Sequence, residues 1–199
     1  MEVLVLGNDG LRQKSEAVTV FDADVTSLAE NMFALMQKKR GVGLAAPQVG
    51  VLKRVFVLQA EDGVKRIFVN PNIIETSKET RSMEEGCLSI PGIYHEIVRP
   101  SHIKVQAQDT AGKPFTLAAS GQLARIILHE YDHLEGVLYI DRADETFRQN
   151  VTKKIQERET RRLQKLAEKK RKEALLAQRV EQRNMQKLLQ KNGKSAVAG

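Results

Sequence analysis

The stretch His129-Glu130-Tyr131-Asp132-His133 decides how the rest of this sequence is interpreted. Its two histidines lie four positions apart, so on a helix both imidazoles share one face and can reach one metal ion. Glu130 follows the first histidine and can act on a water molecule without binding the metal itself. This motif holds half of the four histidines in the chain, which favours a metal site over two unrelated surface histidines.

The residues around the motif predict that it lies on a helix covering residues 121–134. Ser120 can cap the start of this helix, and Gly136 follows its end. One face of the helix carries an apolar stripe, formed by Leu123, Ile126, Ile127 and Leu134. The motif therefore stands beside a half-buried face.

A second helix is predicted over residues 25–40, with Asp24 as its cap and Gly41 at its end. The following segment, 41–50, is too rich in glycine and small residues for a regular element, and its early glycines allow a close approach of the backbone. Short β-rich runs separated by turns are predicted at 55–58, 67–69, 73–74, 103–108 and 115–117. We expect an α+β fold, with mixed or antiparallel sheets packed around the helix of the motif.

Composition excludes several classes of protein. The chain has 199 residues, of which 41% are hydrophobic, and no run approaches the roughly 18 consecutive apolar residues of a membrane span. The N-terminus lacks the basic segment of a signal peptide. The single cysteine, Cys87, excludes an internal disulfide. We expect a cytoplasmic monomer with no membrane partner.

Charge divides the chain into two parts. Residues 150–199 contain 15 Lys and Arg against 5 Asp and Glu, whereas residues 1–149 contain 17 against 20. Such asymmetry predicts a separately acting basic tail, which we expect to be a helical extension over 150–199, while 1–149 form the domain that carries the H-E-x-x-H motif and would be catalytic. Apolar residues in the extension are too sparse for a convincing heptad repeat.

The motif still lacks a third ligand for its metal. No histidine follows His133, and the downstream glutamates Glu145, Glu157 and Glu159 stand in polar or basic surroundings. The remaining soft ligand is Cys87. A lone cysteine is commonly a small buried hydrophobe, but beside an incomplete metal motif the ligand interpretation is the better one.

Three segments together resemble the signature motifs of bacterial peptide deformylases. They are Gly41-Val42-Gly43-Leu44-Ala45-Ala46-Pro47-Gln48, Glu85-Gly86-Cys87-Leu88-Ser89 and His129-Glu130-Tyr131-Asp132-His133-Leu134. Their order and separations suit that family, and the match spans roughly Phe21 to Asp141. By itself, the first motif would be weak evidence, because glycine-rich loops are common.

The resemblance implies a metal-dependent hydrolase that removes formate from the N-terminal formyl-methionine of nascent polypeptides. It implies one Fe²⁺ per chain held by Cys87, His129 and His133, with Zn²⁺, Ni²⁺ or Co²⁺ able to substitute. Glu130 is then the general base and acid. The Gln48 side-chain amide and the Leu88 backbone N–H are the donors to the oxyanion.

The resemblance also implies a pocket for the methionine side chain and a charged network behind the ligands. The expected substrate-binding residues are Val42, Gly43, Met83, Gly86 and Ile126, with His129 beside them. Glu85, Arg99 and Asp132 are expected to orient the ligands. Three departures stand out: Leu128 replaces the usual glutamine before His129, the opening 7–12 matches loosely, and the rim after Cys87 contains His95. We assign His95 to the rim and His102 to a structural role.

The basic extension would attract a phosphate backbone in a salt-dependent way. In the family a C-terminal helix docks near the ribosomal exit tunnel, so the resemblance implies contact with the ribosome or rRNA. The extension has no aromatic residue, which argues against base stacking.

Two other functions compete with this hypothesis. One is a zinc peptidase of the H-E-x-x-H type, which would not need Cys87 as a ligand. The other is a ribosome-binding module without catalysis, against which the complete set of Gln48, Cys87, Glu130 and both histidines argues.

Overall fold

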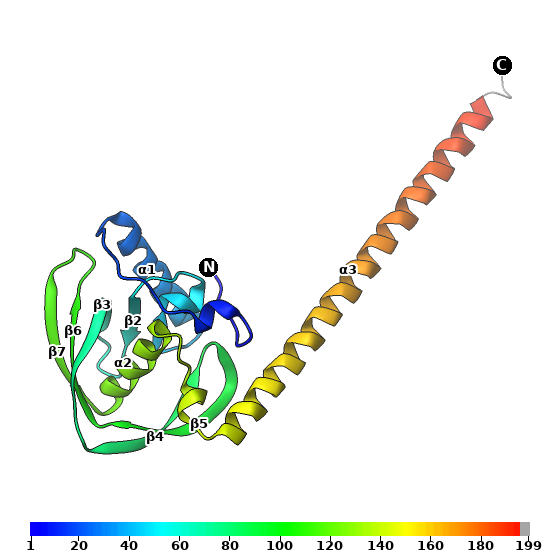
Figure 1. The fold of residues 1–199 in the computed structure, drawn as a ribbon. Coiled ribbons are helices and arrows are strands. Elements are labelled where there is room, and N and C mark those ends of the chain that lie inside the picture. Colours follow the sequence, from blue (N-terminus) through cyan, green and yellow to red (C-terminus); the bar gives the residue numbers. More distant parts are fainter. Residues whose placement is uncertain (196–199) are drawn as a thin grey trace. The chain divides into compact units, whose positions relative to one another are not determined.

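The computed structural model describes residues 1–195 (Figure 1). Contacts between residues divide the chain into two compact units, Met1–Ile155 and Gln156–Gly199. The first unit combines helices with antiparallel β-sheets, so the expected α+β class is confirmed. None of the helices in the described residues is long and apolar enough to cross a membrane.

Helix α1 covers Ala23–Lys38, two residues before the predicted range at either end. Its cap is Asp22 and not the predicted Asp24, because the Asp22 carboxylate accepts hydrogen bonds from the N–H groups of residues 24 and 25. The helix ends in a Schellman motif, in which the Gly41 N–H donates to the carbonyl of Met36. Arg40 occupies the left-handed position of this motif with φ of 57°, where glycine is usual.

A five-stranded antiparallel sheet forms the centre of the first unit, in the order β1-β2-β3-β6-β7. Its strands are β1 Gly43–Ala45, β2 Val55–Gln59, β3 Lys65–Thr76, β6 His102–Gln108 and β7 Pro114–Ser120. The prediction of no regular element in the glycine-rich segment was wrong in part: three of its residues form the edge strand β1, and Ala46–Val49 form a 3₁₀ turn. β3 joins two predicted short runs into one strand, with register irregularities between residues 69 and 75.

Strand β2 separates two hydrophobic cores, because its side chains alternate between the faces of the sheet. Val55 and Val57 pack with α1, whereas Phe56 and Leu58 pack with helix α2, Gly121–Leu134, and all four are fully buried. Figure 1 shows the two helices on opposite sides of this strand. A continuous apolar run is the expected signature of a strand buried on both faces.

Helix α2 covers Gly121–Leu134, as predicted, and carries the H-E-x-x-H stretch. Ser120 holds the N-cap position, but its side chain makes no capping hydrogen bond. Ile126, Ile127 and Leu134 pack into the core beneath the sheet. This core fixes the helix and therefore the direction in which the opposite, polar face points.

A two-stranded antiparallel hairpin, β4 Thr80–Cys87 and β5 Ile90–Pro100, is absent from the predicted strands. β4 has no apolar alternation, and β5 contains Pro91 and Gly92, so neither strand has the expected pattern. The hairpin closes on a third core with the 3₁₀ turn Tyr139–Arg142 and the start of helix α3, Glu145–Ser195. Val151 and Ile155 of α3 are buried in that core.

Candidate metal centre and reaction pocket

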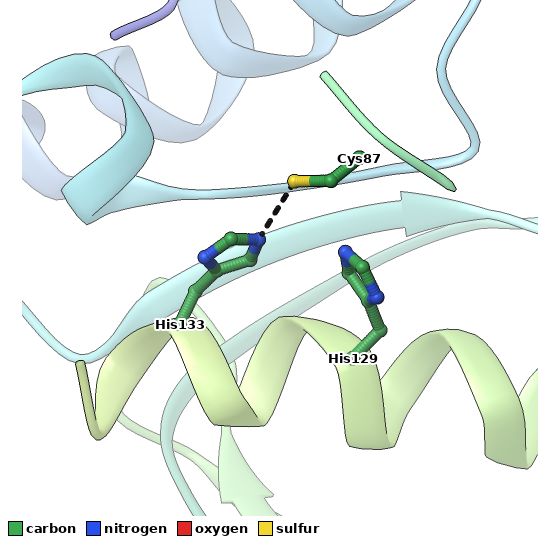
Figure 2. A group of neighbouring side chains, drawn as sticks. All are labelled: Cys87, His129 and His133. Carbon is green, nitrogen blue, oxygen red and sulfur yellow. Dashed lines mark hydrogen bonds between the residues drawn. The ribbon is translucent and has the colours of Figure 1, made fainter. Parts of the chain in front are cut away.

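Three side chains from two distant elements converge on one point (Figure 2). Cys87 ends strand β4, whereas His129 and His133 stand one turn apart on the same face of α2. Their ligand atoms all lie within 4.8 Å of one another, and Cys87 Sγ is 3.2 Å from His133 Nε2. The structure thus brings together all three predicted ligands.

The chemistry of this donor set fits a transition metal. One thiolate and two imidazoles suit Fe or Zn, and three protein ligands leave a fourth position open for reaction. The downstream glutamates make other contacts: Glu145 pairs with Arg148, Glu157 with Arg161 and Glu159 with Arg162. A third ligand of the peptidase type is therefore not found among these glutamates.

Burial and partners set the charge of the two imidazoles. Burial lowers the pKa of His129, but hydrogen bonds with Cys87 and Glu85 outweigh it and raise this pKa to about 10 in the metal-free chain. Burial and the charges of His129 and Arg99 lower the pKa of His133. His129 Nδ1 lies 2.9 Å from a Glu85 oxygen, which leaves its Nε2 for a metal.

Glu130 lies against the same point with a buried carboxylate. The residue is 4% exposed, and its Oε2 has no hydrogen-bond partner among the described residues. Burial, the largest cause, raises the pKa of Glu130 to about 7. A carboxyl group of this kind can both take and return a proton near neutral pH.

The Gln48 side chain is held in place beside the sulfur of Cys87. Its Oε1 accepts a hydrogen bond from the Ala45 N–H at 2.8 Å, and its Nε2 donates to Ser89 Oγ at 3.2 Å and to Cys87 Sγ at 3.4 Å. Leu88 and Ser89 form the turn that follows the cysteine. Of the two predicted oxyanion donors, Gln48 therefore contacts the Cys87 sulfur, and Leu88 follows Cys87 directly in the chain.

Gly43 leaves room for the carboxylate of Glu130. A Cβ atom at Gly43 would stand 2.2 Å from Glu130 Oε1, so any side chain there must displace the carboxylate. Absence of a side chain at Gly43 is thus a requirement of the site.

Gly43→Ala should reduce the rate of the reaction by about a hundredfold, because a displacement of about 1 Å at a reacting group has that effect. Gly10→Ala is the matched control, because Gly10 lies outside the lining of the neighbouring cavity and a Cβ there would come no closer than 3.1 Å to another atom, Asn8 Oδ1. Turnover of both variants measured at equal metal content checks the expectation. Equal rates would show that Glu130 can move without loss.

A network of buried charges lies behind the ligands. Glu85 accepts two hydrogen bonds from Arg99, which also donates to Asp132 at 2.6 Å. Burial alone would raise the pKa of Glu85, but its bonds with His129 and Arg99 lower it far below its usual range. The predicted trio of Glu85, Arg99 and Asp132 is thus buried and connected.

Two arginines that sequence reasoning missed complete the network. Arg125 donates to Glu85 and to the backbone carbonyls of Ile97 and Arg81, which ties α2 to both strands of the hairpin. Arg142 pairs with Asp132. Arg125 could have been identified from its position in the sequence, because it is a lone charged residue one turn before His129 on the same helix.

Arg99→Met should destabilise the fold by about 3 kcal/mol, because it leaves two buried carboxylates without their shared partner. Arg81→Met is the matched control: Arg81 lies opposite Arg99 in the hairpin, and its side chain is exposed. Urea denaturation of both variants measures the difference. Equal midpoints would show that other cations hold Glu85 and Asp132.

A cavity of about 730 Å³ is lined in part by Cys87, His129 and Glu130. Its lining includes every predicted substrate-binding residue: Val42, Gly43, Met83, Gly86 and Ile126. Tyr94 was not predicted, yet it also lines the cavity, and its ring covers Gly86 so closely that a Cβ there would be 2.5 Å away. The pocket can hold an apolar side chain next to the ligand cluster.

The departures noted in the sequence have structural counterparts. Leu128 is partly buried and packs against the core between α2 and the sheet. The His95 ring stacks on Phe147 with centroids 3.8 Å apart, away from the three ligands. His102 begins strand β6 and pairs with Ser120 of β7.

Comparison with known proteins gives one consistent result. The family model described as polypeptide deformylase matches residues 1–149. The peptide deformylase of Treponema pallidum strain Nichols is 47% identical over 154 residues, covering 77% of this chain and 94% of that protein. Peptide deformylase 1 of Clostridium perfringens is 51% identical over 132 residues, covering 66% and 89%. The crystal structure of the Ehrlichia chaffeensis peptide deformylase with actinonin has a TM-score of 0.78 at 35% identity, covering 80% and 97%.

Proposed function

The chain belongs to the polypeptide deformylase family, whose members remove the formyl group from the N-terminus of nascent polypeptides, and we propose that Cys87, His129 and His133 hold its metal. The convergence of these three ligand atoms within 4.8 Å carries the proposal. The metal is proposed to be Fe²⁺. A zinc peptidase is not favoured, because the relatives are deformylases.

The metal, when bound, lowers the pKa of a water molecule and polarises the formyl oxygen. Glu130 takes the proton of the attacking water and returns it to the departing amine of methionine, which releases formate. Its buried, partnerless oxygen and its pKa of about 7 support this double role.

We assign Gln48 and Leu88 to stabilise the oxyanion formed on the formyl group. The Gln48 carboxamide is fixed through Ala45 and Ser89, so its N–H group needs no reorganisation during the reaction. The pocket residues Val42, Met83 and Ile126 would receive the methionine side chain, with Gly43 and Gly86 presenting backbone to the peptide.

Formate release from formyl-Met-Ala-Ser by the anaerobically purified protein tests this assignment. We expect rapid release with Fe²⁺ that is lost in air, because the thiolate and Fe²⁺ both have accessible oxidised forms. With Zn²⁺ we expect release that is slower or that stays stable in air. Absence of release from protein with one metal per chain would contradict the proposed centre. We propose that the protein acts as a monomer and in the cytoplasm, where nascent polypeptides are made.

We further propose that residues 1–149 act as the catalytic domain and that the basic extension, residues 150–199, contacts the ribosome or rRNA. Its 15 Lys and Arg exceed its 5 Asp and Glu by ten, more than a solvated helix requires. Such an excess would attract the RNA backbone through phosphates, with an affinity that falls steeply with salt.

Changing Lys169, Lys170, Arg171 and Lys172 together to Gln should weaken binding to purified ribosomes and flatten its dependence on salt. All four side chains are exposed, and Gln is compatible with a helix. Co-sedimentation at several salt concentrations measures the effect, and formate release from a tripeptide should stay unchanged. A truncation control should begin after Ile155, because Val151 and Ile155 are core residues. Undiminished binding by both proteins would exclude the extension as the contact.

A further inference from the structure

The mouth of the reaction cavity carries two unpaired cations. Lys39 and Arg40 line it, both are exposed, and neither side chain forms an ion pair or hydrogen bond with any described residue. Glu84 is the exposed carboxylate of the same lining. The exposed charged residues of the lining are therefore two cations and one carboxylate, an excess of positive charge where a substrate enters.

Nothing in the packing of the fold requires arginine at position 40. Its backbone is left-handed, with φ of 57°, a conformation that is unfavourable for any residue with a side chain. Glycine would satisfy the Schellman motif without this cost. An exposed arginine at such a position suggests that its side chain serves another purpose.

The path of a peptide through the cavity leads past Arg40. β1 is the edge strand of the sheet, and its Gly43 lies against Glu130, where the formyl group reacts. An extended peptide can add to a free sheet edge through backbone hydrogen bonds. With its formyl end at Gly43 and its remainder leaving by the mouth, the peptide passes the segment 40–42, which joins the end of α1 to β1.

Spacing then determines which substrate residue reaches Arg40. Residues 40–42 are not part of a strand, so Arg40 lies at most about 11 Å from Gly43, the length of three extended residues. An extended peptide covers this distance in about three residues, so with formyl-methionine at Gly43 its third and fourth residues come within reach of the Arg40 side chain. Lys39 extends the positive charge in the same direction.

We propose that Lys39 and Arg40 give this deformylase a preference for nascent chains with Asp or Glu at the third or fourth residue, formyl-methionine being the first. The inference rests on the proposed function of the site. Exposed ion pairs are weak, so we expect about a fivefold preference in kcat/KM for Asp over its uncharged counterpart Asn. We expect the Asp peptide to have a lower KM and an unchanged kcat, because the contact is made equally before and during the reaction.

The test uses C-terminally amidated peptides, formyl-Met-Ala-Xaa-Ala-Ala-Ala with Xaa as Asp, Asn or Lys, and a control peptide with Asp at the sixth position. We expect kcat/KM in the order Asp, Asn, Lys at low salt, with the differences reduced at 0.5 M salt, where the screening length falls to a few ångströms. Asp at the sixth position should give no preference.

Variants separate the two cations from the general charge of the protein. Lys39→Gln with Arg40→Gln should reduce the ratio of Asp to Asn to about one, whereas Arg40→Lys should retain most of it. Lys38→Gln is the matched control, because Lys38 is exposed at the end of the same helix but does not line the cavity. Arg40→Gly should also lower the ratio, because it removes the guanidinium, and should raise Tm by about 2 °C by relieving the left-handed backbone.

Three outcomes would overturn the inference: a ratio of one in the unmodified protein, an unchanged ratio in the double variant, or an equal decrease with Lys38→Gln. The Asn peptide reports the reaction itself. Formate release from the Asn peptide with no preference for Asp would refute the inference and leave the proposed function standing. No release from any peptide would refute both.

Discussion

Replacing Glu130 with Gln should lower the rate of formate release by about a thousandfold while the protein still binds its metal. Gln has nearly the same shape as Glu but cannot accept a proton from water. The carboxylate is 4% exposed, its Oε2 is without a partner among the described residues, and burial raises its pKa to about 7. These properties are those of a group that exchanges protons and not of one that holds the fold together.

A formate dehydrogenase coupled assay gives the rate, and elemental analysis gives the metal content of the same sample. Glu135→Gln is the matched control: Glu135 caps the end of α2 and pairs with Lys14 and Arg54, outside the cavity lining. We expect this control to remain within about twofold of the unmodified rate. If Glu130→Gln lost metal and activity in parallel, Glu130 would have to be a ligand and not the base.

Replacing Cys87 with Ser should abolish both stable metal binding and activity. A serine hydroxyl is neutral at pH 7, whereas the cysteine provides a soft thiolate. Because changes to residues behind a metal ligand already cost 10–100-fold in affinity, we expect loss of a ligand itself to cost more than about a hundredfold. Equilibrium dialysis with Zn²⁺, which avoids oxidation, measures the affinity.

Gln48→Ala is the counterpart of this variant, because Gln48 touches Cys87 without being a ligand. It should keep the metal and lose about a hundredfold in rate, as expected for one missing donor to an oxyanion. The pair of variants thus separates binding of the metal from stabilisation of the reacting group. Normal metal affinity in Cys87→Ser would favour a site with a different third ligand.

The sequence predicted the helices α1 and α2, with α1 shifted by two residues, and most but not all residues of the candidate site. The stripe of Leu123, Ile126, Ile127 and Leu134 predicted α2 to the residue, and the three motifs identified the residues that converge in the cavity. The membership of the family and the α+β class are confirmed. The assignment of individual roles stays a prediction until the variants are measured.

The β4–β5 hairpin could not be predicted because its stability comes from tertiary contacts and not from its own pattern. Ile90, Ile93 and Ile97 of β5 pack against Leu138 and Tyr139, which are distant in sequence. The charged positions of β4 are equally uninformative: the adjacent Glu84 and Glu85 point to opposite faces, and Glu85 can be buried because Arg99, Arg125 and His129 are its partners. The local pattern of apolar and polar residues does not reveal such tertiary partners.

Strand β2 has a consequence for the accuracy of the site. Its fully buried residues alternate between small and large, with valines toward one helix and Phe56 and Leu58 toward the other. A slip of one residue against β1 or β3 would force Phe56 into space shaped for valine and leave a void on the opposite face. The strand therefore admits one alignment only, and a collection of random substitutions should show it to be among the least tolerant segments of the chain.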